Sequence, residues 1–137
     1  MEPTGARRYL KTHEWVRLLP DGTAEVGLSA HALRMLGPLE QVSLPDRGLP
    51  VLAGEPCCEL ESRKCVTALY APVTGVVTEV NGALEDDPAL LSREKGNGWL
   101  FRCGCVSEEG ALLSAEDYLA RIGERDEQEE GKLNSYF

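Results

Sequence analysis

Residues 59–75 read ELESRKCVTALYAPVTG, and this stretch decides the fold class that we expect for the chain. Two runs of strand-forming residues, 57–61 and 66–70, flank a four-residue segment that contains Lys64. The pattern predicts a β-hairpin with Lys64 at or beside its tip, where its side chain points into solvent. A modifying enzyme can reach such an amine, and a group attached to a rigid, protruding tip can visit several active sites. An ordinary exposed turn lysine is the alternative that this residue alone leaves open.

The rest of the chain repeats the alternation of short strands and turns, punctuated by proline and glycine. Besides the hairpin we predict strands at 15–18, 23–28, 40–44, 76–80 and 98–103, with a turn at 71–75. Ser29 is placed to cap a helix over 30–36 that Gly37 stops. A helical turn is predicted at 86–91, and a closing helix at 115–122, capped by Ser114 and ending at Gly123. Many short strands with few helices indicate a small β-sandwich or flattened barrel.

Length and charge bound the organisation and the partners. The 137 residues fit one domain, which we expect over 9–123, between a flexible segment 1–8 and an acidic, polar tail 124–137. A net charge of −9 argues against nucleic acid as a partner, because phosphate binding needs a basic surface. No apolar run is long enough to span a membrane, and the first residues lack the apolar region of a secretory signal.

The cysteines carry no recognisable metal motif. There are five, an odd number, which indicates a reducing compartment in a chain without a secretory signal. Neither Cys57 and Cys58 nor Cys103 and Cys105 have the C-x-x-C spacing of a zinc site. In regular strands the first pair would point to opposite faces and the second pair to the same face. We expect most of these thiols to act as small apolar packing groups.

The segments ESRKC at 61–65 and APVTG at 71–75 resemble the lipoylation region of the H protein of the glycine cleavage system. The resemblance continues in order and spacing from Tyr9 to Ile122. Further matching segments are THEWV at 12–16, VGL at 26–28, LG at 36–37, EVNGALEDDP at 79–88, GWL at 98–100 and AEDY at 115–118.

This resemblance implies a fold and a function. The fold is mainly β, a lipoyl-domain-like barrel-sandwich hybrid with short helices that include a C-terminal helix. The cofactor is lipoate, bound covalently to Lys64, with Glu61 and Ser62 recognised by a lipoate ligase or lipoyl transferase. The implied role is that of a non-catalytic carrier without catalytic residues or a metal. It takes the aminomethyl group of glycine from the P protein, a glycine decarboxylase, to the T protein, an aminomethyltransferase, and electrons to the L protein, a dihydrolipoyl dehydrogenase. A monomer is expected.

The resemblance also implies a surface cleft in which the loaded arm is protected from water. Thr12 and Glu14 would be its polar contacts, with Glu14 facing the ammonium in a charge-assisted hydrogen bond worth roughly 1.5–3 kcal/mol. A solvated strand residue is the alternative for Glu14, and His13 is expected to be structural. The apolar wall of the cleft would consist of Leu28, Ala32 and Leu36.

Three positions depart from the family pattern. Ala68 stands where an acidic residue often helps to hold the aminomethyl group, so one polar contact is missing. Arg63 stands at a position that is usually small and apolar, and Cys65 at a position that is usually alanine. Exchange between the Cys65 thiol and the dithiol of the arm is a minor hypothesis, because it requires an exposed thiol of low pKa.

Other functions stay open beside the glycine-cleavage carrier. An H-like lipoate relay protein, which donates lipoyl groups to other complexes, is mildly favoured by Ala68. A biotin carrier usually has methionines beside its lysine, which this chain lacks, and a cysteine hydrolase using His13 and Cys65 has no supporting motif. The resemblance implies the mitochondrial matrix for a eukaryotic chain, which we favour slightly, and the cytoplasm for a bacterial one.

Overall fold

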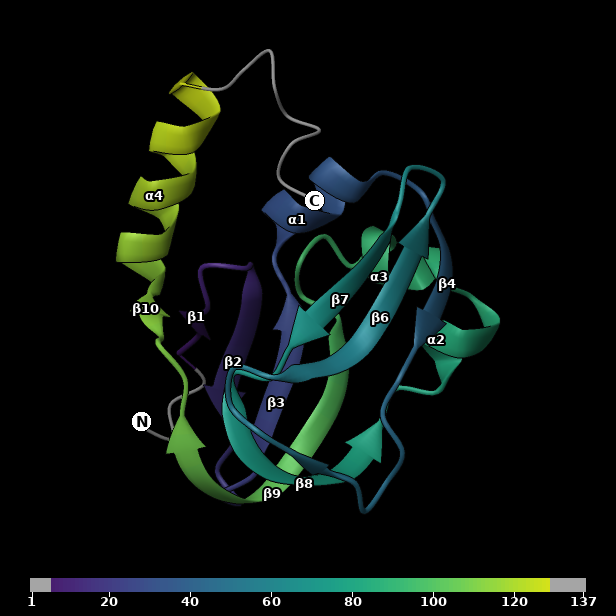
Figure 1. Ribbon diagram of the computed structural model, residues 1–137, viewed down its shortest axis with the longest axis vertical. Helices are drawn as coiled ribbons and strands as arrows, with labels where there is room; N and C mark the ends of the chain where they lie inside the picture. The colour runs from purple at the N-terminus through teal and green to yellow at the C-terminus, as the bar shows by residue number, and fades with distance from the viewer. Residues whose placement is uncertain (1–5, 129–137) are drawn as a thin grey trace.

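The computed structural model describes residues 6–128, with side chains as far as Gly123. Its strands form two sheets, one of seven strands in the order β10-β1-β2-β3-β9-β8-β5 and one of three strands in the order β4-β6-β7 (Figure 1). Every strand pair is antiparallel. Over the described residues no ladder joins one sheet to the other, so the sheets face each other without closing into a barrel. The predicted class, mainly β with short helices that include a C-terminal one, is confirmed.

The strands are β1 (Arg8–Tyr9), β2 (Glu14–Leu18), β3 (Ala24–Leu28), β4 (Leu39–Ser43), β5 (Pro50–Val51), β6 (Pro56–Ser62), β7 (Val66–Tyr70), β8 (Val73–Val80), β9 (Trp99–Glu109) and β10 (Leu113–Ser114). The helices are α1 (Ala30–Leu36), α2 (Ala83–Asp86), α3 (Ala89–Arg93) and α4 (Ala115–Gln128).

The hydrophobic core lies between the two sheets and under α1. The small sheet contributes Leu60 and Leu69, and the large sheet contributes Val26 and Phe101, all almost completely buried. Because side chains alternate along a strand, the other faces of β6 and β7 carry Glu59, Glu61, Val66 and Ala68. Figure 1 shows the tip of the β6–β7 hairpin, α1 and the C-terminal end of α4 at the same, upper end of the molecule.

Local signals predicted some elements well. Helix α1 has the predicted bounds, and the Ser29 hydroxyl accepts a hydrogen bond from the Ala32 amide, as expected of an N-cap. Strand β7 also has the predicted bounds. Ser114 Oγ accepts from the Asp117 amide at 3.1 Å, which confirms the predicted cap of α4.

Other boundaries were wrong. Strand β8 begins at Val73, within the predicted 71–75 turn, and β9 continues to Glu109 rather than ending near residue 103. Helix α4 continues to Gln128 and does not stop at Gly123. Glycine ends a helix when it takes a positive φ, and Gly123 does not do so. The proposed division of the chain at residues 9 and 123 stays a prediction, with residues 1–5 and 129–137 outside the described part; Arg8 belongs to β1.

All five cysteines are free thiols, but both predictions about their faces were wrong. Cys103 is buried and Cys105 exposed, because Cys105 has a φ of 52° that breaks the alternation of β9. Cys57 and Cys58 are both partly buried against the core, and the neighbouring Cys57 thiol together with burial raises the pKa of Cys58. The register of β6 against β7 shifts between Pro56 and Cys58, so the simple strand alternation does not apply there.

Candidate carrier site

Ser62 stabilises the hairpin tip through hydrogen bonds within the turn. Its backbone N–H donates to the Cys65 carbonyl at 2.9 Å, which closes the turn. Its hydroxyl oxygen accepts from the backbone N–H groups of Lys64 at 3.2 Å and Cys65 at 3.3 Å. With 4% of its surface exposed, Ser62 sits beneath the tip and satisfies amides that a short turn would otherwise leave unpaired. The backbone at Lys64 is therefore fixed by a neighbour two residues away.

Lys64 is exposed at this tip, as predicted. Its Nζ donates to the carbonyl oxygen of Met35 in α1 at 3.4 Å, so the amine lies over the end of that helix. Neighbouring Arg63 is also exposed, and its Nε is 3.9 Å from a carboxylate oxygen of Glu40, a weak surface pair. The hairpin thus presents an exposed amine on a fixed backbone.

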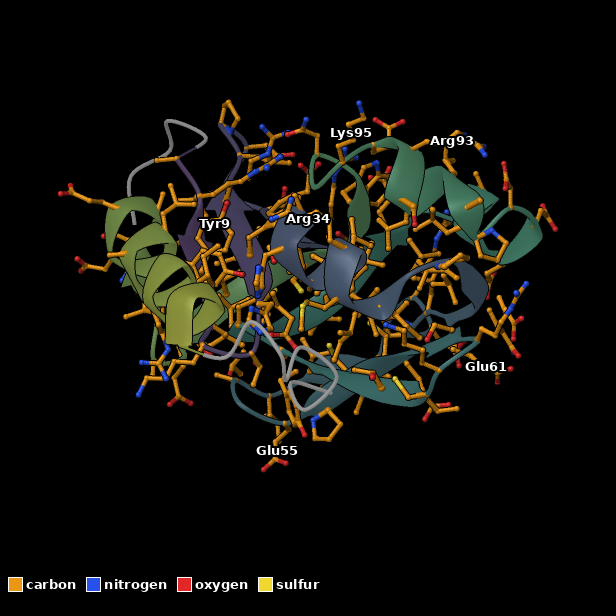
Figure 2. The ribbon with its side chains drawn as sticks, turned by 90° about the horizontal axis from the view of Figure 1, so that it is seen from above. Tyr9, Arg34, Glu55, Glu61, Arg93 and Lys95 are labelled. Carbon is orange, nitrogen blue, oxygen red and sulfur yellow. The ribbon has the colours of Figure 1, made fainter. Side chains whose placement is uncertain are left out.

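Glu61 stands on the outer face of the small sheet. It is half-buried, and in the register it lies between Gln41 of β4 and Val66 of β7, whose side chain is 57% exposed. Figure 2 shows Glu61 on the side of the molecule away from α4. An enzyme that approaches Lys64 from the sheet side would meet this carboxylate and the apolar Val66 together.

Glu14 is buried and held by two donors. It is 1% exposed, its Oε1 accepts from the Thr12 hydroxyl at 2.5 Å, and its Oε2 accepts from the Tyr70 backbone N–H at 2.7 Å. Loss of solvent raises the pKa of Glu14 from 4.5 to about 7, although both hydrogen bonds act in the opposite direction. The alternative of a solvated strand residue is therefore wrong.

Thr12 and Tyr70 also line a surface cavity of about 300 Å³, together with Leu10, Lys11, Gly54 and Ala111. Since the same two residues donate to Glu14, the carboxylate lies just behind the wall of this cavity. Thr12 and Glu14 are brought together as predicted. Their role towards an ammonium group stays a prediction.

The three residues predicted as the apolar wall of a cleft are core residues in this structure. Leu28 and Ala32 have no exposed surface, and Leu36 exposes 1%. They pack with the two sheets in the main hydrophobic cluster. Their role as a wall for the arm stays a prediction, and in this conformation they offer almost no surface to it.

A buried polar cluster ties α4 to the sheet. The Tyr118 hydroxyl lies 2.8 Å from His13 Nδ1 and 2.8 Å from Ser29 Oγ, and the Tyr118 ring stacks on Tyr9 with centroids 4.3 Å apart. His13 has a φ of 88°, and its carbonyl accepts from the Ser29 amide. His13 is buried within this cluster, a position that fits the structural role expected for it. The contact between His13 and Tyr118 could not be predicted from the sequence, because 105 residues separate the two and no local signal marks such a pair.

The positions that depart from the family pattern lie near the hairpin. Ala68 is exposed and pairs in register with Glu59 of β6, so a carboxylate stands on the neighbouring strand. Cys65 is half-buried, with its Sγ 3.4 Å from the Thr67 hydroxyl. Among residues 6–128 no group of three His, Cys, Asp or Glu side chains is placed to hold a metal ion, and no helix is long and apolar enough to cross a membrane.

A mainly β domain that displays one lysine on a serine-closed hairpin defines the class of lipoyl-domain-like carrier proteins. Comparison with known proteins gives the family. The family model described as glycine cleavage H-protein matches residues 7–125, and the chain belongs to this family.

Relatives and a solved structure agree with this assignment. The chain is 46% identical to the glycine cleavage system H protein of Streptomyces coelicolor over 117 residues, covering 85% of this chain and 94% of that protein. It is 46% identical to the Shewanella baltica OS155 protein of the same name over 120 residues, covering 85% and 93%. A crystal structure of a glycine cleavage system H protein from Mycobacterium marinum superposes with a TM-score of 0.81 at 41% identity, covering 87% of this chain and 98% of that one.

Proposed function

We propose that the chain is the lipoyl carrier of a glycine cleavage system, with lipoate bound to Lys64 through an amide. The observation that carries this proposal is the exposed Lys64 at a tip whose backbone is fixed by Ser62. A primary amine that a modifying enzyme can reach fits the carboxyl group of lipoate. When bound, lipoate supplies a reversible disulfide–dithiol couple, and the chain itself supplies position.

The proposed roles of the surrounding residues follow from their places. Ser62 holds the acceptor in one orientation, and Glu61 offers a carboxylate on the outer sheet face to the lipoate ligase or lipoyl transferase. Glu14 is the proposed anion for a cargo ammonium group. With a pKa of about 7 it changes charge near neutrality, and an approaching cation favours its ionised form. Thr12, which lines the cavity and donates to Glu14, orients that carboxylate.

The partners follow from membership of the glycine cleavage system. We propose the P, T and L proteins as the enzymes that load, unload and reoxidise the arm, with this chain contributing no catalytic group. A carrier that must present one tip to three enzymes works as a monomer. The relatives named above are bacterial, so we propose the bacterial cytoplasm; the mitochondrial expectation finds no support in them.

Reconstitution tests this function. P, T and L proteins from a bacterial relative are combined with the lipoylated chain, and release of CO₂ from labelled glycine is measured. The wild type and an Arg47→Lys control, changed at an exposed turn, should support turnover, whereas Lys64→Arg should support none. Turnover by the Lys64→Arg variant would refute the carrier role of this residue.

The lipoate relay is the second candidate, favoured by the exposed Ala68 where the family often has an acid. One experiment distinguishes the glycine-cleavage carrier from the lipoate relay. A chain that is lipoylated on Lys64 and is not loaded by the P protein is a relay if an added lipoyl transferase moves its lipoyl group from the Lys64 amide to a lysine of an acceptor domain, which leaves Lys64 as a free amine. An Ala68→Asp variant that gains loading would identify the missing carboxylate as the reason.

A further inference from the structure

A second groove lies on the outer side of α1, away from the core. It has a volume of about 540 Å³ between α1 and the end of α3 with the loop that follows. Its apolar lining comes from Ala30, Leu33 and Pro38, and its cationic groups are Arg34 and Lys95. Figure 2 shows Arg34 and Lys95 on the same upper side of the molecule. An apolar groove with two cations is a local exception in a chain whose net charge is −9.

One hydroxyl in the lining of the groove lacks a hydrogen-bond partner among the residues that the structure describes. Ser92, which also lines it, has an Oγ atom shielded from solvent that makes no hydrogen bond within the described part of the chain. Most buried polar groups have a partner, and leaving one without costs free energy. An occupant that brings a polar group to Ser92 beside its apolar groups would therefore complete this surface.

We propose that residues 129–137 of the same chain occupy this groove. Their sequence is EEGKLNSYF. The carboxylates of Glu129 and Glu130 complement the two cations of the groove, and the side chains of Leu133, Tyr136 and Phe137 supply the apolar groups. The polar residues 134 and 135 lie between them in the sequence, where a partner for Ser92 is needed.

The chain geometry permits this contact. Helix α4 is described as far as Gln128, and Figure 1 shows this part of α4 at the same end of the molecule as α1. Nine extended residues span up to about 30 Å. Because the segment is covalently attached, its effective concentration at the groove is of millimolar order, which favours it over a free partner with the same weak contacts.

Occupation of this groove has a consequence for the hairpin. The groove is lined by residues of the same helix whose Met35 carbonyl accepts from Lys64, so a segment bound there contacts the helix that the amine also contacts. The inference does not rest on the lipoyl function, and its test uses the unmodified full-length chain.

Nuclear magnetic resonance of the full-length chain tests the proposal. We expect nuclear Overhauser contacts between the Phe137 or Tyr136 ring protons and the Leu33 methyl groups, with intensities relative to intraresidue cross-peaks that do not change on dilution. Replacing Leu133, Tyr136 and Phe137 by serine in one variant should abolish these contacts and shift the amide signals of Ala30 and Gly37. A peptide of residues 129–137 added to that variant should shift them back.

A charge exchange tests the electrostatic part with a matched control. Arg34→Glu should weaken the contacts, and adding Glu129→Lys with Glu130→Lys should restore them, whereas Arg47→Glu, at an exposed turn outside the groove, should leave them unchanged. The proposal would be overturned if the amide signals of Ala30 and Gly37 were unchanged in the triple-serine variant. It would also be overturned if the Overhauser contacts to Leu33 appeared only at high protein concentration. Signals that respond only to an added P, T or L protein would assign the groove to that enzyme instead.

Discussion

Replacing Glu14 by glutamine should change how the stability of the protein depends on pH. In the folded state burial raises the pKa of Glu14 from 4.5 to about 7, so the folded carboxyl binds its proton more tightly than the unfolded one. The contribution of Glu14 to stability is therefore greatest below the unfolded pKa and is lost as pH rises from 4.5 through about 7. The difference between a pKa of 4.5 and one of about 7 corresponds to roughly 3 kcal/mol of unfolding free energy.

Urea unfolding between pH 4 and pH 8.5, followed by tryptophan fluorescence, measures this effect. Glutamine cannot ionise. Its carbonyl oxygen can accept from the Tyr70 N–H while its NH2 group donates to the Thr12 hydroxyl oxygen, so the variant keeps both contacts at every pH. The informative quantity is therefore the difference in unfolding free energy between Glu14→Gln and wild type. It should move by roughly 3 kcal/mol in favour of glutamine from pH 4 to pH 8.5.

An exposed carboxylate supplies the control for this prediction. Glu108→Gln should give a difference that stays nearly constant over the same range, because Glu108 is exposed. A constant difference for Glu14→Gln as well would show that Glu14 ionises as easily in the folded protein as in the unfolded chain. The reasoning from burial would then fail.

Three other variants test the fold and the hairpin. Gly27→Ala would place a Cβ atom 2.2 Å from the Trp15 ring, and we expect a loss of at least about 1–3 kcal/mol in thermal unfolding; an unchanged Tm would contradict this packing. Tyr118→Phe removes the hydroxyl that contacts His13 and Ser29, which should cost about 1–3 kcal/mol of unfolding free energy and speed amide exchange at the start of α4. Unchanged exchange would show that this hydroxyl does not hold α4 on the sheet. Ser62→Ala leaves the two tip amides without their acceptor and should slow enzymatic lipoylation while the Tm falls only slightly; wild-type rates would show that the tip needs no such support.

The sequence predicted elements whose causes are local. Ser29 caps α1 through an amide three residues away, and the bounds of β7 follow from strand-forming residues between two turns. The position of Lys64 at a hairpin tip could also be predicted from the sequence, because the two strands and the turn lie within a few residues of it. The strand pattern did not reveal Ser62 as the acceptor inside the turn, although serine is a common turn residue.

Features that depend on distant contacts were missed or wrong. The sequence around Glu14 fits a strand residue that is either buried or exposed to solvent. Only the approach of Tyr70 from the other sheet shows that Glu14 is buried. The pairing of Tyr118 with His13 joins opposite ends of the chain. Cys105 breaks the alternation of β9 by its positive φ, which no residue type in that segment announces. Tertiary packing decides each of these features, and local propensity does not.

The proposed function depends above all on Lys64 being the attachment point of a lipoyl group. We would incubate the full-length chain with a lipoate ligase, lipoate and ATP, and record intact and peptide mass spectra, with a known lipoyl domain as the control substrate. We expect the mass gain of one lipoyl group, located on Lys64 and absent from the Lys64→Arg variant. A folded chain that gains no mass while the control domain is modified, or a gain on another lysine, would contradict the assignment.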